Sequence, residues 1–536
     1  MKKVLYLHDR DESHISVWAK SEIEKLFEGD GRFSLTSETD SKKIKDYDAV
    51  IVFLKKILPD ELKKLDDYAK AGGNLLLICP PAGSVSALKE ITGCNVLQDK
   101  GLQQFTVFAE EKNHYITQRF PAEFQINDLL FDVEPLHSTI IFSTYIGNKK
   151  IPVVSVRECG KGKFSCVFAG NTTQTWYNFD FRKIVIRCIA WMLGEKQKEK
   201  TIHCGLIGYG PMFGMGKGHA SWINATTGMK TVAVCDTNPE RVEAARQELP
   251  DLLGYFTSTE EMLKMKEIDL VVGIVPHNVH CEVALKGFAY GKHVILEKPF
   301  CISVEEADKM IETARKNKLM LSVFHNRRWD GDYIAIKNIV NNGLIGDIFH
   351  IECFIGNYAH PRYWWRSDKK ISGGVMHDWG AHFIDWILNL VPSKITGISG
   401  DFQKRVWFSV SNEDHGQALI KFENGVTADF MISSITAINK PKWKIFGTKG
   451  AIEVNWDTID RINLVSFVSG VKQEGIVKIT PSYGHTEYYR NIADHLLMEE
   501  ELIVKPEQSR RVIGVVEAAE KASKLNKILP PFENCE

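Results

Sequence analysis

The first 195 residues alternate short apolar runs with amphipathic stretches. The apolar runs predict β-strands, and the stretches 13–27 and 60–71 repeat apolar residues at helical spacing. The predicted strands are Val4–His8, Ala49–Leu54, Asn74–Cys79, Ile140–Thr144, Pro152–Val156 and Phe164–Ala169. A helix over Phe181–Leu193 closes this region. Alternating strands and helices predict an α/β domain, with a mostly parallel sheet covered by helices on both faces.

The pattern changes twice further along the chain. Residues 202–322 again alternate, with strands near 202–207, 230–235, 269–275 and 293–296. After about residue 345 strand-like runs predominate, which predicts an α+β domain with a large, mostly antiparallel open sheet. Its predicted strands are Ile348–Ile355, Gln417–Phe422, Thr427–Ile432, Trp443–Phe446 and Ile452–Val454, followed by a last helix over Ser509–Leu525.

The polar stretch 194–200 separates the first region from a new strand at Ile202. We therefore predict four segments: a first domain over 1–195, a linker over 196–201, a dinucleotide-binding domain over 202–322 and an α+β domain over 323–536. An open sheet exposes a surface that a second subunit most simply covers, so a homo-oligomer, dimer or larger, is expected.

Composition and charge narrow the function. The 536 residues contain 67 Lys and Arg against 68 Asp and Glu, so no basic excess favours nucleic acid. No apolar run is long enough for a membrane span, and the N-terminus lacks the apolar core of a signal peptide. The 11 cysteines are scattered without metal-ligand spacing, which predicts no metal site and a reducing compartment. A cytoplasmic protein is expected.

A glycine-rich turn follows the strand that ends at Ile207. It begins Gly208-Tyr209-Gly210, and the third glycine is Gly214 or Gly216. Glycines in this position let the backbone approach a pyrophosphate at the N-terminus of the next helix. The next strand ends at Asp236, whose carboxylate would accept hydrogen bonds from the adenosine ribose and repel a 2′-phosphate. NAD is therefore favoured over NADP.

Three segments carry a family pattern: 269–280, Glu297-Lys298-Pro299 and 373–385. Through them, residues 202–530 resemble the Gfo/Idh/MocA oxidoreductases. Segments 447–450 and 489–491 also match that family's C-terminal domain. Two features depart from its pattern: an insertion of about three residues in the glycine turn, and Val275-Pro276 where Thr-Pro is usual.

The resemblance implies a catalytic set of Lys298, Asp378 and His382. Asp378 and His382 are four residues apart, so on a helix they lie on one face. A histidine can take the hydroxyl proton when hydride leaves an alcohol carbon, and a lysine can polarise the reacting oxygen. The expected cofactor residues are Gly208, Tyr209, Gly210, Gly214, Asp236, Pro276, His280, Glu297 and Lys298.

The substrate-facing loops of that family correspond to 326–328 and 364–366, with Tyr358, His360 and His377 nearby. Aromatic faces mixed with polar groups suit polyhydroxylated rings. The substrate candidates are Asn326, Arg328, Tyr358, Trp365 and His377.

The N-terminal domain resembles the trehalose-utilisation (ThuA-like) family, most clearly over 151–194. That family has a flavodoxin-like fold related to class I glutamine amidotransferases. Cys79 ends a strand, as an amidotransferase nucleophile would, but Pro80 follows it. The oxyanion hole needs the backbone N–H of that next residue, and proline has none. We expect this domain to be non-catalytic.

Together these features predict an oxidoreductase that moves a hydride between NAD and a secondary hydroxyl or keto carbon of a sugar, glycoside or cyclitol. One alternative is a glycoside-cleaving enzyme that recycles its NAD through a transient keto-sugar. Another is a non-catalytic NAD or sugar sensor, since the same fold serves regulators. Retention of Lys298, Asp378 and His382 together argues against the sensor.

Overall fold

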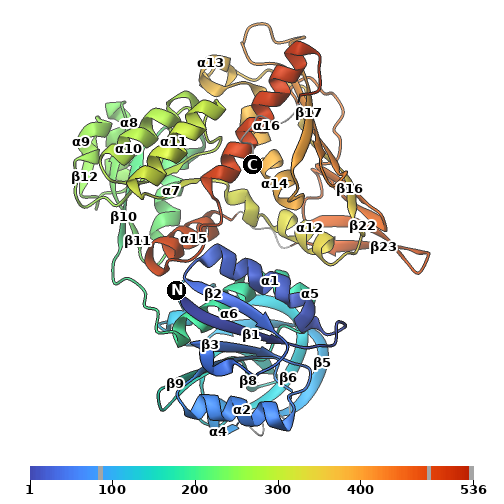
Figure 1. The fold of residues 1–536 in the computed structure, drawn as a ribbon. Helices are drawn as coiled ribbons and strands as arrows, with labels where there is room; N and C mark the ends of the chain where they lie inside the picture. Colours follow the sequence, from blue (N-terminus) through green and yellow to red (C-terminus); the bar gives the residue numbers. More distant parts are fainter. Residues whose placement is uncertain (82–88, 480–483, 530–536) are drawn as a thin grey trace. The chain divides into compact units, whose positions relative to one another are not determined.

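The computed structural model describes residues 1–81, 89–479 and 484–529 (Figure 1). The chain forms two compact units. The first unit contains Met1–Glu199 together with Asp494–Glu501, and the second contains Lys200–Ala493 and Leu502–Glu536. The boundary near residue 200 lies at the linker predicted from the sequence. Residues 494–501, by contrast, group with the first unit rather than with the C-terminal domain around them.

The first unit is built on one sheet in the order β2-β1-β3-β4-β9-β8-β7-β5-β6. Its strands are β1 Lys2–His8, β2 Phe33–Glu38, β3 Ala49–Phe53, β4 Asn74–Ile78, β5 Cys94–Ala109, β6 Glu123–Pro135, β7 Thr139–Ile146, β8 Lys149–Cys159 and β9 Gly162–Val167. Its helices are α1 Ile15–Asp30, α2 Pro59–Lys70, α4 Lys89–Thr92, α5 Thr173–Tyr177 and α6 Phe179–Met192.

The expectation of a mostly parallel sheet is correct for only half of this sheet. The strands from β2 to β9 pair in parallel, whereas β8, β7, β5 and β6 pair antiparallel. The long strands β5 and β6 were not predicted. Only alternate residues at the ends of β5 are buried, and its middle is exposed, so neither strand shows the continuous apolar run that marks a parallel strand.

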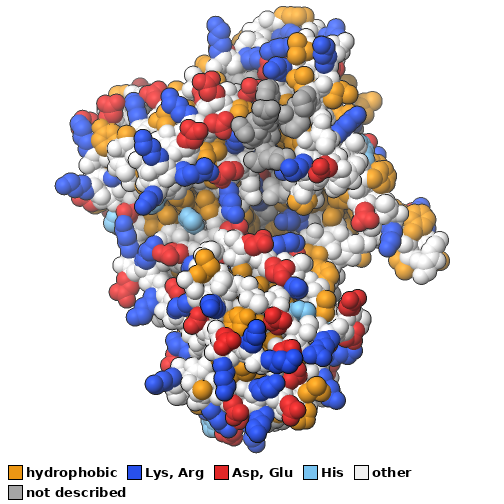
Figure 2. All heavy atoms as spheres, viewed as in Figure 1, with side chains coloured by type: hydrophobic (Ala, Val, Ile, Leu, Met, Phe, Trp, Pro, Cys, Tyr) orange, Lys and Arg blue, Asp and Glu red, His pale blue; other side chains and the backbone are white. Residues whose placement is uncertain are grey.

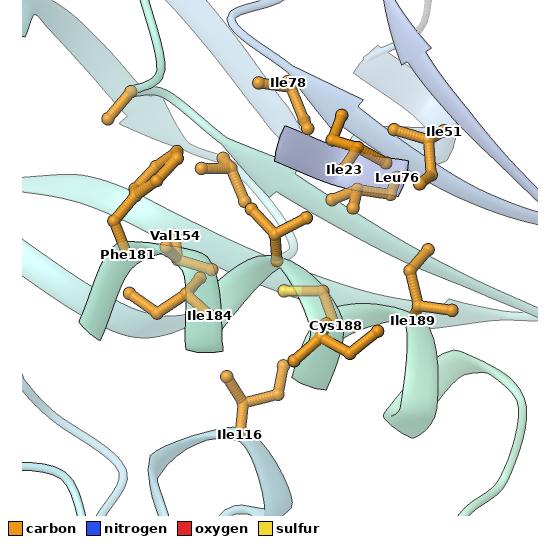
Figure 3. Close-up of a cluster of buried hydrophobic side chains, with 14 of the residues drawn as sticks. Ile23, Ile51, Leu76, Ile78, Ile116, Val154, Phe181, Ile184, Cys188 and Ile189 are labelled. Atoms are coloured by element: carbon orange, nitrogen blue, oxygen red, sulfur yellow. The ribbon is translucent and has the colours of Figure 1, made fainter. Parts of the chain in front are cut away.

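The parallel strands are apolar throughout because helices cover both faces of the sheet. Val4 and Tyr6 of β1 belong to the core that includes α1 and α6, and Leu5 and Leu7 belong to the opposite core with α2. Figure 3 shows the first of these cores, where Ile184, Cys188 and Ile189 of α6 lie beside sheet and α1 side chains. This double burial explains why the sequence predicted these strands well.

Buried charges hold residues 494–501 within the first unit. Asp494, which is 1% exposed, accepts hydrogen bonds from Arg119 Nε at 2.5 Å and from Lys183 Nζ. Arg187 contacts Asp494 Oδ1 at 2.9 Å and donates from Nε to Glu500 Oε1 at 2.6 Å. Burial alone would raise the pKa of Asp494, but these cations outweigh it and lower the pKa to about 2.

The second unit begins with an all-parallel sheet in the order β12-β11-β10-β13-β14-β15. Its strands are β10 Ile202–Ile207, β11 Met229–Cys235, β12 Gly254–Phe256, β13 Leu270–Gly273, β14 His293–Leu296 and β15 Leu321–Val323. Its helices are α7 Met215–Asn224, α8 Pro239–Glu248, α9 Thr259–Leu263, α10 His280–Ala289 and α11 Val304–Asn317. The chain leaves β10 first toward β11 and later toward β13, so the topological switch point lies at β10, as in a Rossmann fold.

The rest of the second unit is an open sheet in the order β17-β18-β19-β16-β20-β21-β22-β23. All its neighbours pair antiparallel except β16 and β19. The strands are β16 Ile348–Gly356, β17 Ile395–Gln403, β18 His415–Phe422, β19 Thr427–Ser433, β20 Trp443–Gly447, β21 Gly450–Val454, β22 Arg461–Val468 and β23 Val471–Lys478. The helices are α12 Gly331–Asn341, α13 Lys369–Ser372, α14 Val375–Leu390, α15 His485–Met498 and α16 Pro506–Leu525. From Asp494 onward, α15 belongs to the first unit. α14 and α16 pack on one face of the sheet and bury its alternate residues. The predicted fold class is confirmed.

The surface carries both signs of charge. Figure 2 shows Lys and Arg mixed with Asp and Glu across the visible face, in keeping with a net charge of −1. Within the described residues, no helix has both the length and the apolarity needed to cross a membrane.

Candidate active site

A cavity of about 730 Å³ lies in the second unit, at the carboxyl ends of the Rossmann strands. This is the position where open α/β sheets bind ligands. Ten of the predicted site residues line it: Gly208, Gly210, Asp236, Pro276, Glu297, Lys298, Asn326, Trp365, Asp378 and His382. The structure therefore brings residues from segments far apart in the sequence to one cavity.

The glycine turn has the backbone that close approach requires. Gly208 has φ 101°, and a Cβ atom there would lie 2.1 Å from the carbonyl oxygen of Ile274. A Cβ atom on Gly210 would meet no heavy atom within 4 Å, so the cavity side of this turn is open. A Cβ atom on Gly216 would lie 3.1 Å from Cα of Tyr209, so Gly216 permits the close packing of α7 on the turn. The residues present thus fit a bound pyrophosphate.

Gly214 and Tyr209 do not belong to the described lining of this cavity. Gly214 takes a left-handed conformation at the start of α7. The Tyr209 hydroxyl donates to Glu248 at 2.7 Å, and its backbone N–H donates to Asp236 Oδ2 at 2.7 Å. The contribution of Tyr209 is therefore to hold Asp236.

Asp236 is fixed at the edge of the cavity. In addition to the bond from Tyr209, the backbone N–H of Asn238 donates to Asp236 Oδ1 at 2.9 Å. Two backbone donors orient the carboxylate and leave further lone pairs for hydroxyl groups. A phosphate placed beside it would meet a fixed negative charge. This arrangement suits the unphosphorylated ribose of NAD.

A tight group of charges lies deeper in the cavity. Lys298, two residues after the end of β14, donates from Nζ to Asp378 Oδ1 at 2.6 Å, and Arg366 NH1 lies 2.9 Å from the same oxygen. Burial would raise the pKa of Asp378, but the positive charges of Lys298 and Arg366 outweigh it and hold the pKa well below its usual range. Asp378 is therefore ionised and orients the lysine.

His382 follows Asp378 by one turn of α14 and also lines the cavity. It is 5% exposed, and its Nδ1 is buried with no hydrogen-bond partner among the described residues. Burial, and then the charges of Lys298 and Arg327, lower the pKa of His382 well below its usual value. The imidazole is neutral near pH 7 and can accept a proton.

Glu297 is positioned by a network that sequence analysis did not predict. Its Oε1 lies 3.0 Å from Nε2 of His219, whose Nδ1 lies 2.6 Å from the Tyr489 hydroxyl. The backbone N–H of Lys298 donates to Glu297 Oε2 at 2.9 Å. The only sequence signal for His219 was its place at the end of the glycine turn.

Besides Gly214 and Tyr209, four more predicted residues lie outside the described cavity lining. The buried ring of His280 contacts the carbonyl oxygens of Val275 at 3.0 Å and Phe300 at 3.2 Å, which fixes the loop rather than a ligand. Arg328 is buried and donates from Nε to Asp385 at 2.8 Å. Tyr358 is 58% exposed, and His377 is buried at the start of α14.

Other cavity residues were not among the predicted site residues. His277, Phe213, Trp379 and His485 line the cavity, as do Arg327, Trp364 and Arg366 from the predicted substrate loops. His277 directly follows Pro276, and Trp379 directly follows Asp378. Their position next to a predicted site residue is the signal by which sequence analysis could have selected them.

Comparison with known families agrees with this geometry. Residues 202–325 match an oxidoreductase family with an NAD-binding Rossmann fold, and residues 333–453 match the GFO/IDH/MocA C-terminal domain. Residues 202–453 belong to the Gfo/Idh/MocA oxidoreductase family. Residues 3–192 match the trehalose-utilisation (ThuA) family. Both predicted resemblances are confirmed, and the second unit is an NAD-binding oxidoreductase.

Individual relatives cover different shares of the chain. An uncharacterized oxidoreductase of Schizosaccharomyces pombe is 36% identical over 28% of this chain and 42% of its own length. The NADP⁺-dependent scyllo-inositol 2-dehydrogenase of Bacillus subtilis is 25% identical over 62% of this chain and 97% of its own. The crystal structure of an NAD-binding protein from Listeria innocua is 28% identical, with a TM-score of 0.56, over 63% of this chain and 99% of its own.

Proposed function

We propose that this protein transfers a hydride between NAD and a secondary hydroxyl or keto carbon of a sugar, glycoside or cyclitol. The observation that carries the proposal is the pairing of Lys298 with Asp378, beside a neutral His382, in the cavity that begins at the glycine turn. A dehydrogenase needs these two elements together: a dinucleotide site, and groups that manage a proton and a developing negative charge.

The cofactor would lie along the carboxyl ends of the strands. Gly208 and Gly210 would admit its pyrophosphate, Asp236 would accept hydrogen bonds from the adenosine ribose, and Pro276 and Glu297 would border the nicotinamide end. When bound, the nicotinamide supplies the acceptor or donor of the hydride. The protein's own groups supply the proton transfer.

In the oxidation direction, neutral His382 accepts the proton of the substrate hydroxyl. The Lys298 ammonium stabilises the negative charge that develops on that oxygen as the carbon–hydrogen bond breaks. Asp378 holds Lys298 Nζ, and Arg366 balances the carboxylate charge, so the ammonium keeps its position. In the reverse direction, protonated His382 returns the proton to the alkoxide.

The substrate class follows from the cavity wall and from a relative. Trp365 and Trp379 offer apolar faces, while Asn326 and Arg327 offer polar groups, and such mixtures suit polyhydroxylated rings. The scyllo-inositol 2-dehydrogenase of B. subtilis is named for oxidising a cyclitol. A ring polyol or its glycoside is the proposed substrate.

The test is a panel of sugars, glycosides and cyclitols mixed with NAD, with NADH absorbance and product analysis recorded together. NADH and a matching keto product support the proposal. Glycoside cleavage without net NADH would instead favour the NAD-recycling reaction, and NAD binding without turnover on any member would favour a sensor.

For the first unit we propose a non-catalytic role. Asn171 Nδ2 donates to Cys79 Sγ at 2.9 Å, and burial raises the pKa of this thiol well above its usual value, so it stays protonated. An unreactive thiol followed by Pro80 is unsuited to nucleophilic attack. The test is glutamine hydrolysis by the full-length protein, which should be undetectable.

We also propose a homo-oligomer. The hairpin β22–β23 exposes Phe467, Val468, Val471 and Ile476, each 48–61% accessible. Exposed apolar clusters of this kind are usually covered by another chain. Light scattering at micromolar concentration tests this, and a strictly monomeric mass would contradict it.

A further inference from the structure

His277 carries an unused hydrogen-bonding atom in the wall of the active-site cavity. The residue begins the short helical turn His277–Val279, directly after Pro276 and four residues after the end of β13. It lines the cavity and is 2% exposed. Neither the family motifs nor the proposed chemistry assigns it a task.

The protonation of the ring follows from its contacts. Nδ1 lies 2.8 Å from the carbonyl oxygen of Ser372, and a carbonyl oxygen only accepts, so Nδ1 carries the hydrogen. Burial lowers the pKa of His277 well below its usual value, and the neighbouring His280 lowers it further. The neutral ring therefore has a bare lone pair on Nε2.

That lone pair has no partner among the described residues. Nε2 is buried from solvent and accepts no hydrogen bond from the described part of the chain. The rings of His277 and Trp365 pack edge to face, with their centroids 4.8 Å apart. Buried acceptors are rarely left unsatisfied, and one in the wall of a ligand cavity calls for an explanation.

We propose that His277 Nε2 accepts a hydrogen bond from a neutral N–H or O–H group of the bound ligand and so helps to select it. Two ligand groups have this chemistry: the carboxamide N–H of the nicotinamide, and a substrate hydroxyl. The neighbourhood fits both, because His277 adjoins Pro276 on one side and Ser372, in the approach to α14, on the other. The proposal rests on the proposed function, since it requires NAD and substrate to occupy this cavity.

Two substitutions separate the acceptor at Nε2 from the structural bond at Nδ1. In His277→Asn the amide nitrogen lies near the position of Nδ1, so the bond to Ser372 is kept and the Nε2 acceptor is lost. In His277→Gln the amide oxygen reaches the position of Nε2, so an acceptor is kept and the bond to Ser372 is lost. A purely structural role would spare the Asn variant and damage the Gln variant.

The first readout is binding to the full-length protein by calorimetry. The ligands are NAD and 3-acetylpyridine adenine dinucleotide, which lacks the carboxamide N–H. If the nicotinamide is the donor, the unmodified protein binds NAD more tightly by roughly 3- to 10-fold, the value of one net hydrogen bond. His277→Asn should bring the two dissociation constants together, and His277→Gln should retain most of the difference.

The second readout is kcat/KM for the polyol that the NADH screen identifies, against its monodeoxy analogues. If a substrate hydroxyl is the donor, one deoxy analogue is rejected by the unmodified protein and by His277→Gln but tolerated by His277→Asn. A change confined to either readout supports the proposal and names the donor. The proposal would be overturned if His277→Asn matched the unmodified protein in both readouts. These are the ratio of the dissociation constants for the two dinucleotides, and the ratios of kcat/KM for the polyol and its deoxy analogues. Failure of the unmodified protein to bind NAD would instead refute the proposed function.

Discussion

Lys298 and Asp378 join the two halves of the second unit through one short hydrogen bond, with Nζ 2.6 Å from Oδ1. Lys298 lies two residues after the end of the Rossmann strand β14, and Asp378 lies in the first turn of the helix that packs on the open sheet. The lysine side chain is 12% exposed, so its charge acts where little water screens it. This pairing places a fixed cation in the cavity.

Replacing that cation should affect chemistry more than binding. Lys298→Ala should lower kcat by roughly 10²-fold or more, because the alkoxide loses its charge stabilisation. The dissociation constant for NAD should change little, since no adenosine contact is expected at this residue. Steady-state kinetics and calorimetry measure the two effects. The matched control is Lys286→Ala, an exposed pair with Glu282 on α10, which should retain normal turnover.

The pH profile should report His382. Oxidation requires the neutral imidazole, and burial lowers the pKa of His382 from its ordinary value. A base with a lowered pKa stays deprotonated further into the acid range, so kcat/KM should fall only below about pH 6.5. His382→Ala should remove this acid limb and lower kcat by roughly 10²-fold. An acid limb centred above pH 7, or one retained in the variant, would assign the base to another group.

Cofactor preference should depend on Asp236. The unmodified protein should bind NAD more tightly than NADP, because the fixed carboxylate repels a 2′-phosphate. Asp236→Ala should narrow that difference, measured as the ratio of the two dissociation constants. Glu240→Ala removes a nearby exposed carboxylate without touching the turn and should leave the ratio unchanged. Tighter binding of NADP to the unmodified protein would contradict this assignment. The comparison matters because one relative, a scyllo-inositol 2-dehydrogenase of B. subtilis, is named for NADP⁺.

The sequence predicted the site best where residues share one element or follow a strand end. Asp378 and His382 are one helical turn apart, and Gly208 and Lys298 closely follow parallel strands at the same edge of a sheet, so local spacing was enough. Spacing could not decide between Arg327 and Arg328. Arg327 lines the cavity, whereas Arg328 pairs with Asp385, and the choice depends on a helix 57 residues away.

Similar limits apply to the fold. Apolar runs located the doubly covered parallel strands, but β5 and β6 bury only alternate residues along part of their length and gave no such signal. The grouping of residues 494–501 with the first unit depends on Arg119, Lys183 and Arg187, which lie more than 300 residues away. Periodicity carries no information about partners at that distance.

Asp494 offers a direct test of that grouping. Asp494→Ala should destabilise the full-length protein by about 3–5 kcal/mol, since it leaves buried cations without their carboxylate. Urea or thermal unfolding measures the change. The matched control is Glu499→Ala, whose carboxylate is 62% exposed and 3.2 Å from Lys198, and which should cost about 1 kcal/mol or less.

Because the pKa of Asp494 is lowered, the free energy of unfolding should depend on pH in the acid range. The pKa of Asp494 is lowered to about 2 in the folded protein, whereas an unfolded aspartate titrates near its ordinary value of about 4. Between these values the unfolded chain binds the extra proton, so the contribution of Asp494 is complete above about pH 4 and is lost as the pH falls toward 2. Asp494→Asn should therefore lose less stability on acidification than the unmodified protein, while Glu499→Ala should follow the unmodified curve. Parallel acid-unfolding curves for Asp494→Asn and the unmodified protein would show that the cations do not depend on this carboxylate.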